Sequence, residues 1–344
     1  MRPPRSRLRF IALAVSALLM LLSAMLLAIA AGDIGIAPGT VIDVLSNHLL
    51  GTQHPVDPID EGIVWNYRLT RAIVAACCGS ALAVAGLILQ TLLRNALADP
   101  YLLGISAGAS TGAVLVTVAG VGGGLVSMTA GAFAGAITAL TLVALLAQAA
   151  GGSGLRNSGQ IILAGIAGSQ LFNALTALII AKSGSAEQAR GIMFWLLGSL
   201  SGVRWPDVPV TTTVTLIGLL VCLLHSRALD AMTFGAESAA SLGIPVRRVQ
   251  TVLLLTASLM TAVMVSVVGA IGFVGLVIPH VARMLVGSRH RNLLPACAFI
   301  GALFLILADV ASRILLSGQV LPIGVVTALI GAPAFALILM RRRG

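Results

Sequence analysis

The stretch RNALADPYLLGISAGAS, residues 94–110, lies between two long apolar runs in a chain that is 58% hydrophobic and only 9% charged. Asp99 and Pro100 have the pattern of a helix N-cap followed by proline in the first turn. Beyond them, glycine recurs every fourth residue, at Gly104, Gly108 and Gly112. In a membrane, such small-residue spacing lets a second helix approach closely. We therefore expect a helix to begin at Asp99–Pro100 and to pack through this glycine face.

Residues 104–108 also spell Gly-x-Ser-x-Gly, the pattern of a serine-hydrolase nucleophile elbow. That motif requires a strand–turn–helix setting, whereas this copy lies in an apolar segment of a chain with 38 glycines. We interpret the match as a by-product of small-residue packing. A membrane hydrolase stays an alternative, and it predicts loss of turnover in Ser106→Ala.

Apolar segments on both sides of this stretch predict an all-α polytopic membrane protein with about ten transmembrane helices in a single domain, residues 1–344. Runs of about 20 apolar residues are long enough to span a bilayer as helices. The segments are approximately 10–31, 69–93, 101–120, 125–150, 160–181, 207–226, 249–270, 273–287, 293–315 and 320–340.

Two pieces depart from this pattern. Residues 191–200 are too few to span a bilayer and predict an interfacial or re-entrant helix. Pro279 interrupts the eighth segment, so we expect that helix to be kinked or broken.

The charges predict that both termini face the cytoplasm. An even number of spans places the termini on one side. Of the 21 Lys and Arg residues, six then fall outside and 15 inside, as membrane proteins favour. The outer six are Arg68, Arg71, Lys182, Arg190, Arg204 and Arg313. Topology thus explains the net charge of +10, and nucleic-acid binding is not expected.

Two loops are long enough to have structure of their own. Residues 32–67 form the predicted external loop. Residues 227–248 form the predicted internal loop, which is too polar to span the bilayer. We expect two short helices there, separated near Gly235 and ended by Gly243 and Pro245.

Several polar residues lie at or inside the apolar segments. Asp309 is deepest, and an intramembrane carboxylate is a candidate proton relay. Arg313 follows four residues later on the same helix face, so we favour an ion pair between them. Arg68 and Arg71 share a face at the outer start of the second span. They either anchor that end in the interface or, with Arg313, bind acidic side chains through bidentate pairs.

The fifth span carries a polar stripe formed by Gln170, Asn173 and Thr176. Such a stripe either joins helices or lines a pathway, and the pattern is compatible with both. The chain has no Gly-x-x-x-x-Gly-Lys-[Ser/Thr] loop and no His-Glu-x-x-His motif. We predict no catalytic residue, no bound metal and no cofactor in this chain. An ion-gradient-driven secondary transporter would need more intramembrane ionisable groups and stays the alternative from another class.

Long motifs, taken together, resemble the FecCD/BtuC-type permeases. The stretch at 94–110 resembles the family signature Asn-Pro-Leu-Ala-[Asp/Glu]-Pro-x-x-Leu-Gly-x-Ser-x-Gly-Ala, with Ala96 where the family commonly has proline. Residues 269–283, 290–309 and 321–339 look like signatures of the family's second half. The resemblance extends from about residue 68 to the C-terminus.

The resemblance implies a membrane subunit of a binding-protein-dependent ABC importer with a BtuC-like fold. Such a subunit forms a homodimer in the bacterial inner membrane, with the pathway on the two-fold axis. Two cytoplasmic ATPase subunits would bind ATP and Mg, and an external binding protein would deliver the substrate. The family carries iron-siderophores, haem and vitamin B12. The opening stretch most resembles iron-chelate members, so an iron chelate is expected, with vitamin B12 as the alternative.

Roles carried over by position complete the prediction. Arg68, Arg71 and Arg313 would bind acidic residues of the binding protein. The internal loop resembles the family's coupling helices, and the residues expected to contact the ATPase are Glu237, Ser241, Leu242 and Gly243. The predicted gate and pathway residues are Asn157, Ser158, Gly159, Gln170 and Asn173. ATP binding is expected to move the coupling loop and, through it, spans three to five.

Overall fold

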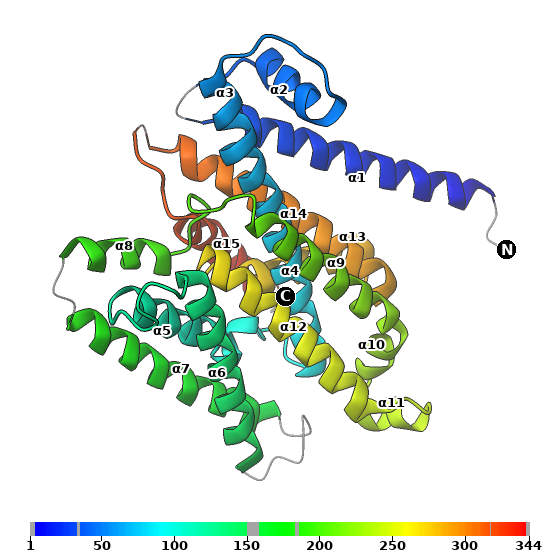
Figure 1. The fold of residues 1–344 in the computed structure, drawn as a ribbon. Helices are drawn as coiled ribbons and strands as arrows, with labels where there is room; N and C mark the ends of the chain where they lie inside the picture. Colours follow the sequence, from blue (N-terminus) through cyan, green and yellow to red (C-terminus); the bar gives the residue numbers. More distant parts are fainter. Residues whose placement is uncertain (1–3, 33–34, 150–157, 183–185, 317, 342–344) are drawn as a thin grey trace.

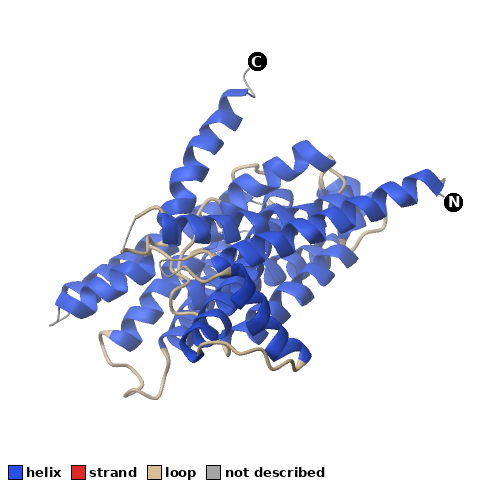
Figure 2. Ribbon diagram, turned by 90° about the horizontal axis from the view of Figure 1, so that it is seen from above, coloured by secondary structure: helices blue, strands red, loops and turns tan. Residues whose placement is uncertain are grey.

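The computed structural model describes all residues except 1–3, 33–34, 150–157, 183–185, 317 and 342–344. The described residues form helices and loops, without a strand (Figures 1 and 2). The longer helices are α1 (Pro4–Ala30), α4 (Thr70–Leu92), α5 (Ile105–Thr117), α6 (Met128–Ala149), α7 (Ser158–Ala181), α9 (Asp207–Leu224), α12 (Val246–Val268), α13 (Val274–Val286), α14 (His290–Ile314) and α15 (Ile323–Arg341). The shorter elements are α2 (Pro38–Leu50), α3 (Pro58–Gly62), α8 (Ala186–Leu196), α10 (Ser226–Met232), α11 (Ala236–Ser241), the π-helical η1 (Ile63–Leu69) and the 3-10 helix η2 (Pro100–Leu103).

A helix lies within each of the ten apolar segments that the sequence indicates. Among the described residues, six stretches are long and apolar enough to cross a membrane: Pro58–Leu92, Met128–Ala149, Gly159–Ala181, Asp207–Leu224, Val246–Val268 and His290–Ile314. Val15–Ala30, Ile105–Thr117, Val274–Val286 and Ile323–Ile338 are shorter apolar helices. The all-helical fold with several apolar spans is confirmed, and ten crossings stay a prediction.

Helix α4 forms the centre of the molecule. It contacts α9, α12, α13 and α14, and most of its residues are buried. A Cβ atom added to Gly79 would clash with the carbonyl of Gly301 on α14, and one added to Gly86 would clash with Gly275 on α13. These glycines therefore let α4 pack against both neighbours backbone to backbone.

Pro279 lies inside a continuous α13 and does not break it, contrary to that part of the expectation. Proline cannot donate to the carbonyl four residues earlier, that of Gly275. Instead, Nε2 of Gln90 on α4 donates to this carbonyl at 3.1 Å, and Oε1 of Gln90 accepts from Nη2 of Arg283 at 2.8 Å. A side chain of the neighbouring helix thus replaces the missing bond, as buried backbone requires.

Helices α5, α6 and α7 form a second group, at the left of Figure 1, which meets the rest mainly through α12. A Cβ atom on Gly108 would clash with the carbonyl of Gly135 on α6, and one on Gly112 with that of Gly131. The glycine face of α5 therefore lies at its closest approach to α6. Gly104 serves a different purpose, because its φ of 75° forms the turn between η2 and α5.

Asp99 is the N-cap of η2, the short 3-10 helix that precedes α5. Its Oδ1 accepts a hydrogen bond from the backbone N of Tyr101 at 2.9 Å, and Pro100 follows in the first turn of η2. The Tyr101 hydroxyl in turn donates to the carbonyl of Ile271 at 3.0 Å. The cap thus also fixes the loop before α13.

The internal loop contains the two short helices that the sequence predicts. Helices α10 and α11 are separated at Gly235, which has φ 115°, and α11 ends before Gly243, which has φ 79°. Helix α8 supplies the short helix expected around residues 191–200, although it starts at Ala186. Below, the end of the molecule that carries α2 and α3 is the outer end, and the end that carries α10 and α11 is the inner end (Figure 1).

Candidate functional site

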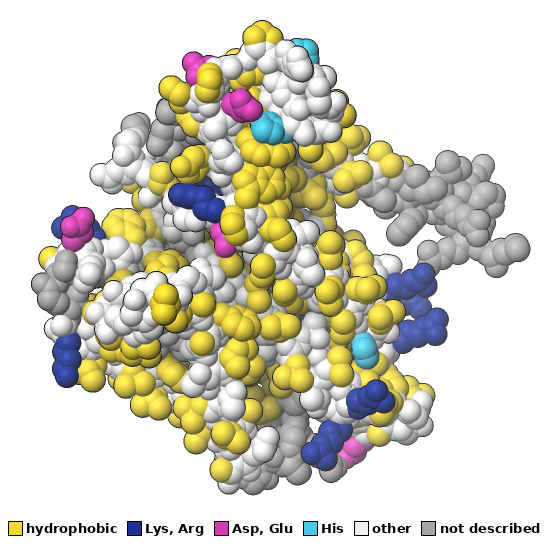
Figure 3. Space-filling model, viewed as in Figure 1, with side chains coloured by type: hydrophobic (Ala, Val, Ile, Leu, Met, Phe, Trp, Pro, Cys, Tyr) yellow, Lys and Arg dark blue, Asp and Glu magenta, His cyan; other side chains and the backbone are white. Residues whose placement is uncertain are grey.

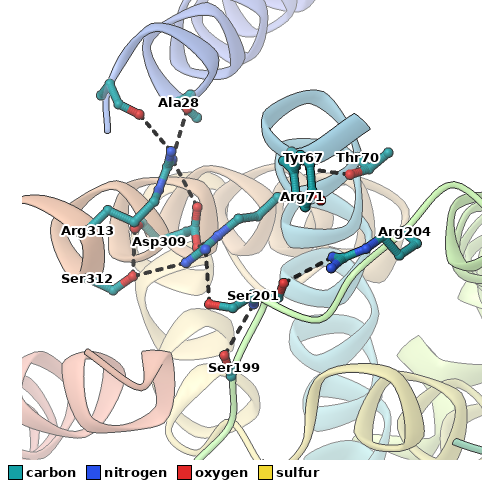
Figure 4. Close-up of polar contacts among 11 residues, drawn as sticks. Ala28, Tyr67, Thr70, Arg71, Ser199, Ser201, Arg204, Asp309, Ser312 and Arg313 are labelled. Atoms are coloured by element: carbon teal, nitrogen blue, oxygen red, sulfur yellow. Dashed lines mark hydrogen bonds and ion pairs between the residues drawn. The ribbon is translucent and has the colours of Figure 1, made fainter. Parts of the chain in front are cut away.

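Asp309 of α14 is the centre of a buried charge network at the outer end (Figure 4). Its Oδ1 is 2.6 Å from Nε of Arg71 on α4, and its Oδ2 is 3.0 Å from Nη2 of Arg313. The predicted pair of Asp309 and Arg313 is confirmed, and Arg71 is a second partner that the sequence did not indicate. Nη1 of Arg71 also donates to Oγ of Ser201 at 3.2 Å. The carboxylate therefore joins α4 to α14.

Arg68 and Arg313 cap the C-terminal end of α1. Nη1 of Arg68 donates to the carbonyls of Ile29 and Ala30 at 3.0 and 2.9 Å, and Nη1 of Arg313 donates to that of Ala31 at 2.6 Å. The last carbonyls of a helix lack intrahelical partners and carry partial negative charge, so they attract guanidinium groups. Each of these arginines is only 7% exposed.

This burial sets a condition on docking at the outer arginines. In the isolated chain, Arg68, Arg71 and Arg313 already bind groups of the same chain, so an acidic partner must compete with those groups. Arg204 lies at the same end, is exposed, and stacks 4.7 Å over the ring of Tyr67. Docking at the three outer arginines stays a prediction.

The residues expected to contact an ATPase are exposed at the inner end. Glu237, Ser241, Leu242 and Gly243 lie on α11 and in the turn that follows it. Leu242 is 73% exposed. In Figure 3, several Lys and Arg side chains lie along this inner edge, and others lie elsewhere on the face; Asp and Glu side chains lie near α2 and α3 and also at scattered positions.

The polar stripe on α7 divides into two parts. Thr176 is buried, and its Oγ1 is 2.8 Å from Oγ1 of Thr111 on α5, so it joins two helices. Gln170 and Asn173 are exposed on the open side of α7. Of the gate residues, Asn157 lies outside the described residues, and Ser158 and Gly159 begin α7. The stripe thus provides helix contact at one position and open polar groups at the other two.

The sequence profile of the FecCD transport family matches residues 18–341, almost the whole chain. The chain belongs to this family. The uncharacterized ABC transporter permease protein YvrB of Bacillus subtilis is 40% identical to this FecCD chain, over 83% of it and 81% of YvrB. The cobalamin import system permease protein BtuC of Halobacterium salinarum is 40% identical, over 81% of this chain and 74% of its own.

Other relatives support the same assignment. The vitamin B12 import system permease protein BtuC of Salmonella arizonae is 36% identical over 94% of this chain and 92% of its own. A solved ABC transporter, described as of the metal-chelate type and inward-facing, superposes with a TM-score of 0.80 and 28% identity, over 96% of this chain and 99% of its own. This FecCD protein is therefore an ABC importer permease.

Sequence reasoning did not single out Gln90, Asp230 or His290, which the fold brings into contact with distant residues. Gln90 and Arg283 support α13, and Asp230 and His290 connect α10 to α14. These contacts join residues 60 or more positions apart, so no local spacing in the sequence predicts them. The only available signal was a polar residue inside or beside an apolar segment.

Proposed function

We propose that this FecCD permease forms the transmembrane pathway of an importer for a metal chelate. Two copies assemble around a two-fold axis, two ATPase subunits bind at the inner end, and a substrate-binding protein delivers cargo at the outer end. The observation that carries the proposal is the family match over residues 18–341. ATP and Mg belong to the ATPase subunits, since this sequence contains no phosphate-binding loop. The inner end faces the bacterial cytoplasm, with both termini, as the arginine distribution favours.

The pathway lies along the open side of α7 in this proposal. Gln170 and Asn173 are exposed there on a mostly apolar helix. Polar side chains are costly against lipid, so they are better accommodated by a water-filled pathway or a second copy. Asn157, Ser158 and Gly159, at the inner start of α7, form the gate.

The binding protein docks at the outer network. The Arg71 side chain is 12% exposed and reaches Ser201, which is exposed, so an acidic residue of the binding protein can replace Asp309 or Ser201 as its partner. Arg68 and Arg313 hold α1 beside this position.

Docking is testable with Arg71→Gln in the assembled importer. We expect affinity for the binding protein to fall by at least about tenfold, because a paired interfacial charge is lost. Lys182→Gln removes another cation predicted to lie outside, in the turn after α7, and it should leave affinity unchanged. Equal affinity for Arg71→Gln and the wild type, with the complex intact, would exclude docking at this residue.

The cargo is a chelate of cobalt or iron. Relatives of 36–40% identity are named as cobalamin and vitamin B12 permeases, which favours cobalamin. An iron-siderophore or haem, expected from the opening stretch, is the second candidate, supported by the structural neighbour of the metal-chelate type.

Proteoliposomes provide the test. The permease, reconstituted with its ATPase and binding protein, should accumulate labelled cobalamin only when ATP is present. Competition by excess ferric siderophore or haem would assign the cargo to iron instead. Uptake by the permease alone, driven by an ion gradient, would contradict the ABC importer and favour a secondary transporter.

A further inference from the structure

The coupling helix α10 is connected to α14 and α4 by a chain of hydrogen bonds. Oδ1 of Asp230 on α10 accepts from both the backbone N and Nδ1 of His290, the first residue of α14, each at 2.8 Å. Nε2 of the same ring is 3.0 Å from Oγ1 of Thr91, in the last turn of α4. His290 is 2% exposed. Three side chains therefore join the coupling loop to two central helices; His290 is buried, whereas the Asp230 side chain is 38% exposed.

The chemistry of the groups fixes the direction of the bond between His290 and Asp230, whereas the bond between Nε2 and Thr91 can run in either direction. A carboxylate only accepts hydrogen bonds, so Nδ1 of His290 carries a proton. Oγ1 of Thr91 is also 2.9 Å from the carbonyl of Leu87, to which its hydroxyl can donate. Because both ring nitrogens have a partner, the ring cannot turn without releasing either α10 or α4.

The same two helices are joined again farther along their length. In the middle, Oγ of Ser80 on α4 donates to the carbonyl of Ala298 on α14 at 2.8 Å, next to the glycine contact described above. At the outer end, Arg71 of α4 binds Asp309 of α14. The α4–α14 pair is therefore fixed at its inner end, its middle and its outer end.

Helix α10 packs on this pair and α11 packs on α12, and neither packs mainly on α5, α6 or α7. Helix α10 contacts α4, α9 and α14, and α11 contacts α12. Movement of α10 thus reaches α4 and α14 directly, whereas it reaches α5–α7 through α12, η2 or the loops. This differs from the sequence-based expectation, in which the coupling loop acts on spans three to five.

We propose that Asp230 and His290 are positioning residues that make the α4–α14 pair a strut between the coupling helices and the outer arginine network. The inference rests on the proposed function as an ABC importer. When the binding protein docks near Arg71 and Asp309, it moves α4 and α14, and this movement reaches α10 and then the ATPase. Movement of the ATPase returns along the same route.

The test uses the complete importer with Asp230→Ala and His290→Ala. ATP hydrolysis is measured with and without loaded binding protein. We expect basal hydrolysis within about twofold of wild type and a loss of stimulation of about tenfold, since one hydrogen bond to a charged group is worth a factor of that order. Asp230→Asn keeps an oxygen that accepts from both nitrogens, and it should retain most of the stimulation.

Thr251→Ala is the matched control. Its exposed hydroxyl, near the inner end of α12, donates to the Arg247 carbonyl of its own helix and to no other residue in the described part of the chain, so stimulation should be unchanged. Full stimulation in both alanine variants would overturn the inference. It would also be overturned if basal hydrolysis or assembly with the ATPase fell in parallel with stimulation, because that marks a purely structural role.

The two proposals fail in different ways. If the wild-type complex shows no ATP-dependent uptake, the proposed function fails. If the wild type transports and the Asp230 and His290 variants keep full stimulation, only the strut fails.

Discussion

Two helix pairs of this permease pack through glycine in the same way but are held together by different forces. Between α4 and α14, Gly79 meets Gly301, and hydrogen bonds or ion pairs fix both ends and the middle. Between α5 and α6, Gly108 meets Gly135, but among the described residues no side-chain hydrogen bond crosses this contact. Close backbone approach sets how near two helices lie, whereas polar contacts decide whether they can slide. We therefore expect α4 and α14 to move as one body and α5 and α6 to shift against each other.

The largest expected effect is on folding. Leucine at Gly79 would clash with the backbone of Gly301, and α14 cannot retreat because it is fixed at both ends. Gly79→Leu should cost more than about 4 kcal/mol and remove most of the folded protein. Gly108→Leu should disrupt the α5–α6 contact but cost less, since among the described residues no side-chain hydrogen bond holds α6 against α5. The two variants are compared by their thermal midpoints Tm and their yields of monodisperse protein. If both variants lose the same stability, the two helix pairs are not held together differently.

The outer ion network should give the next largest effect. Asp309→Ala leaves Arg71 and Arg313 buried without their carboxylate, a change that typically costs about 3–5 kcal/mol. Asp309→Asn keeps an acceptor of the same shape and should cost less. Thermal unfolding of the purified variants measures both. An unchanged Tm for Asp309→Ala would show that the network does not fix the α4–α14 pair.

A pair of matched glycines separates coupling from stability. Gly243 and Gly287 both have φ 79°, and a Cβ atom at either would meet nothing within 4 Å. Tryptophan at each position should cost a similar amount of stability, about 1–3 kcal/mol of backbone strain.

Gly243 directly follows coupling helix α11, whereas Gly287 lies in the loop between α13 and α14. Gly243→Trp should therefore abolish ATPase association or ATP-driven uptake, and Gly287→Trp should not. Normal uptake by Gly243→Trp would show that this turn is not needed for coupling to the ATPase.

The smallest effect is expected at the contact of α5 with α7. Thr111→Val and Thr176→Val each remove one hydroxyl from a bond of 2.8 Å while keeping the side-chain shape. Interhelical bonds in membranes contribute about 0.6 kcal/mol on average. A double-mutant cycle on Tm should return a coupling of that order, and a zero coupling would show that Thr176 is no part of the helix contact.

The sequence predicted the elements well because their signals are local. Gly235 and Gly243 bound two short helices, as the structure shows. Asp99 and Pro100 do start a helix, but it is the four-residue 3-10 helix η2, and the turn at Gly104 delays the start of α5 to Ile105. The same pattern reasoning paired Asp309 with Arg313, which lie four residues apart on one helix.

Contacts between distant segments were not predictable in this way. Arg71 and Asp309 are 238 residues apart, and Asp230 and His290 are 60 apart, so only the fold brings them together. Residue type also gave no sign that Arg68 and Arg313 would cap α1. Burial in an apolar bundle forces each charged group to find a partner, but the partner's identity depends on three-dimensional packing.

Distances between spin labels test the central claim most directly. Leu315, after the outer end of α14, Leu97, after the inner end of α4, and Leu163 on α7 are exposed and take no part in the networks described. With cysteine at each position in the assembled importer, the 315–97 distance should be the same with and without ATP. The 315–163 distance should shift by several ångströms. A shift of the 315–97 distance on ATP binding would contradict the account, because it would show that α4 and α14 do not move as one strut.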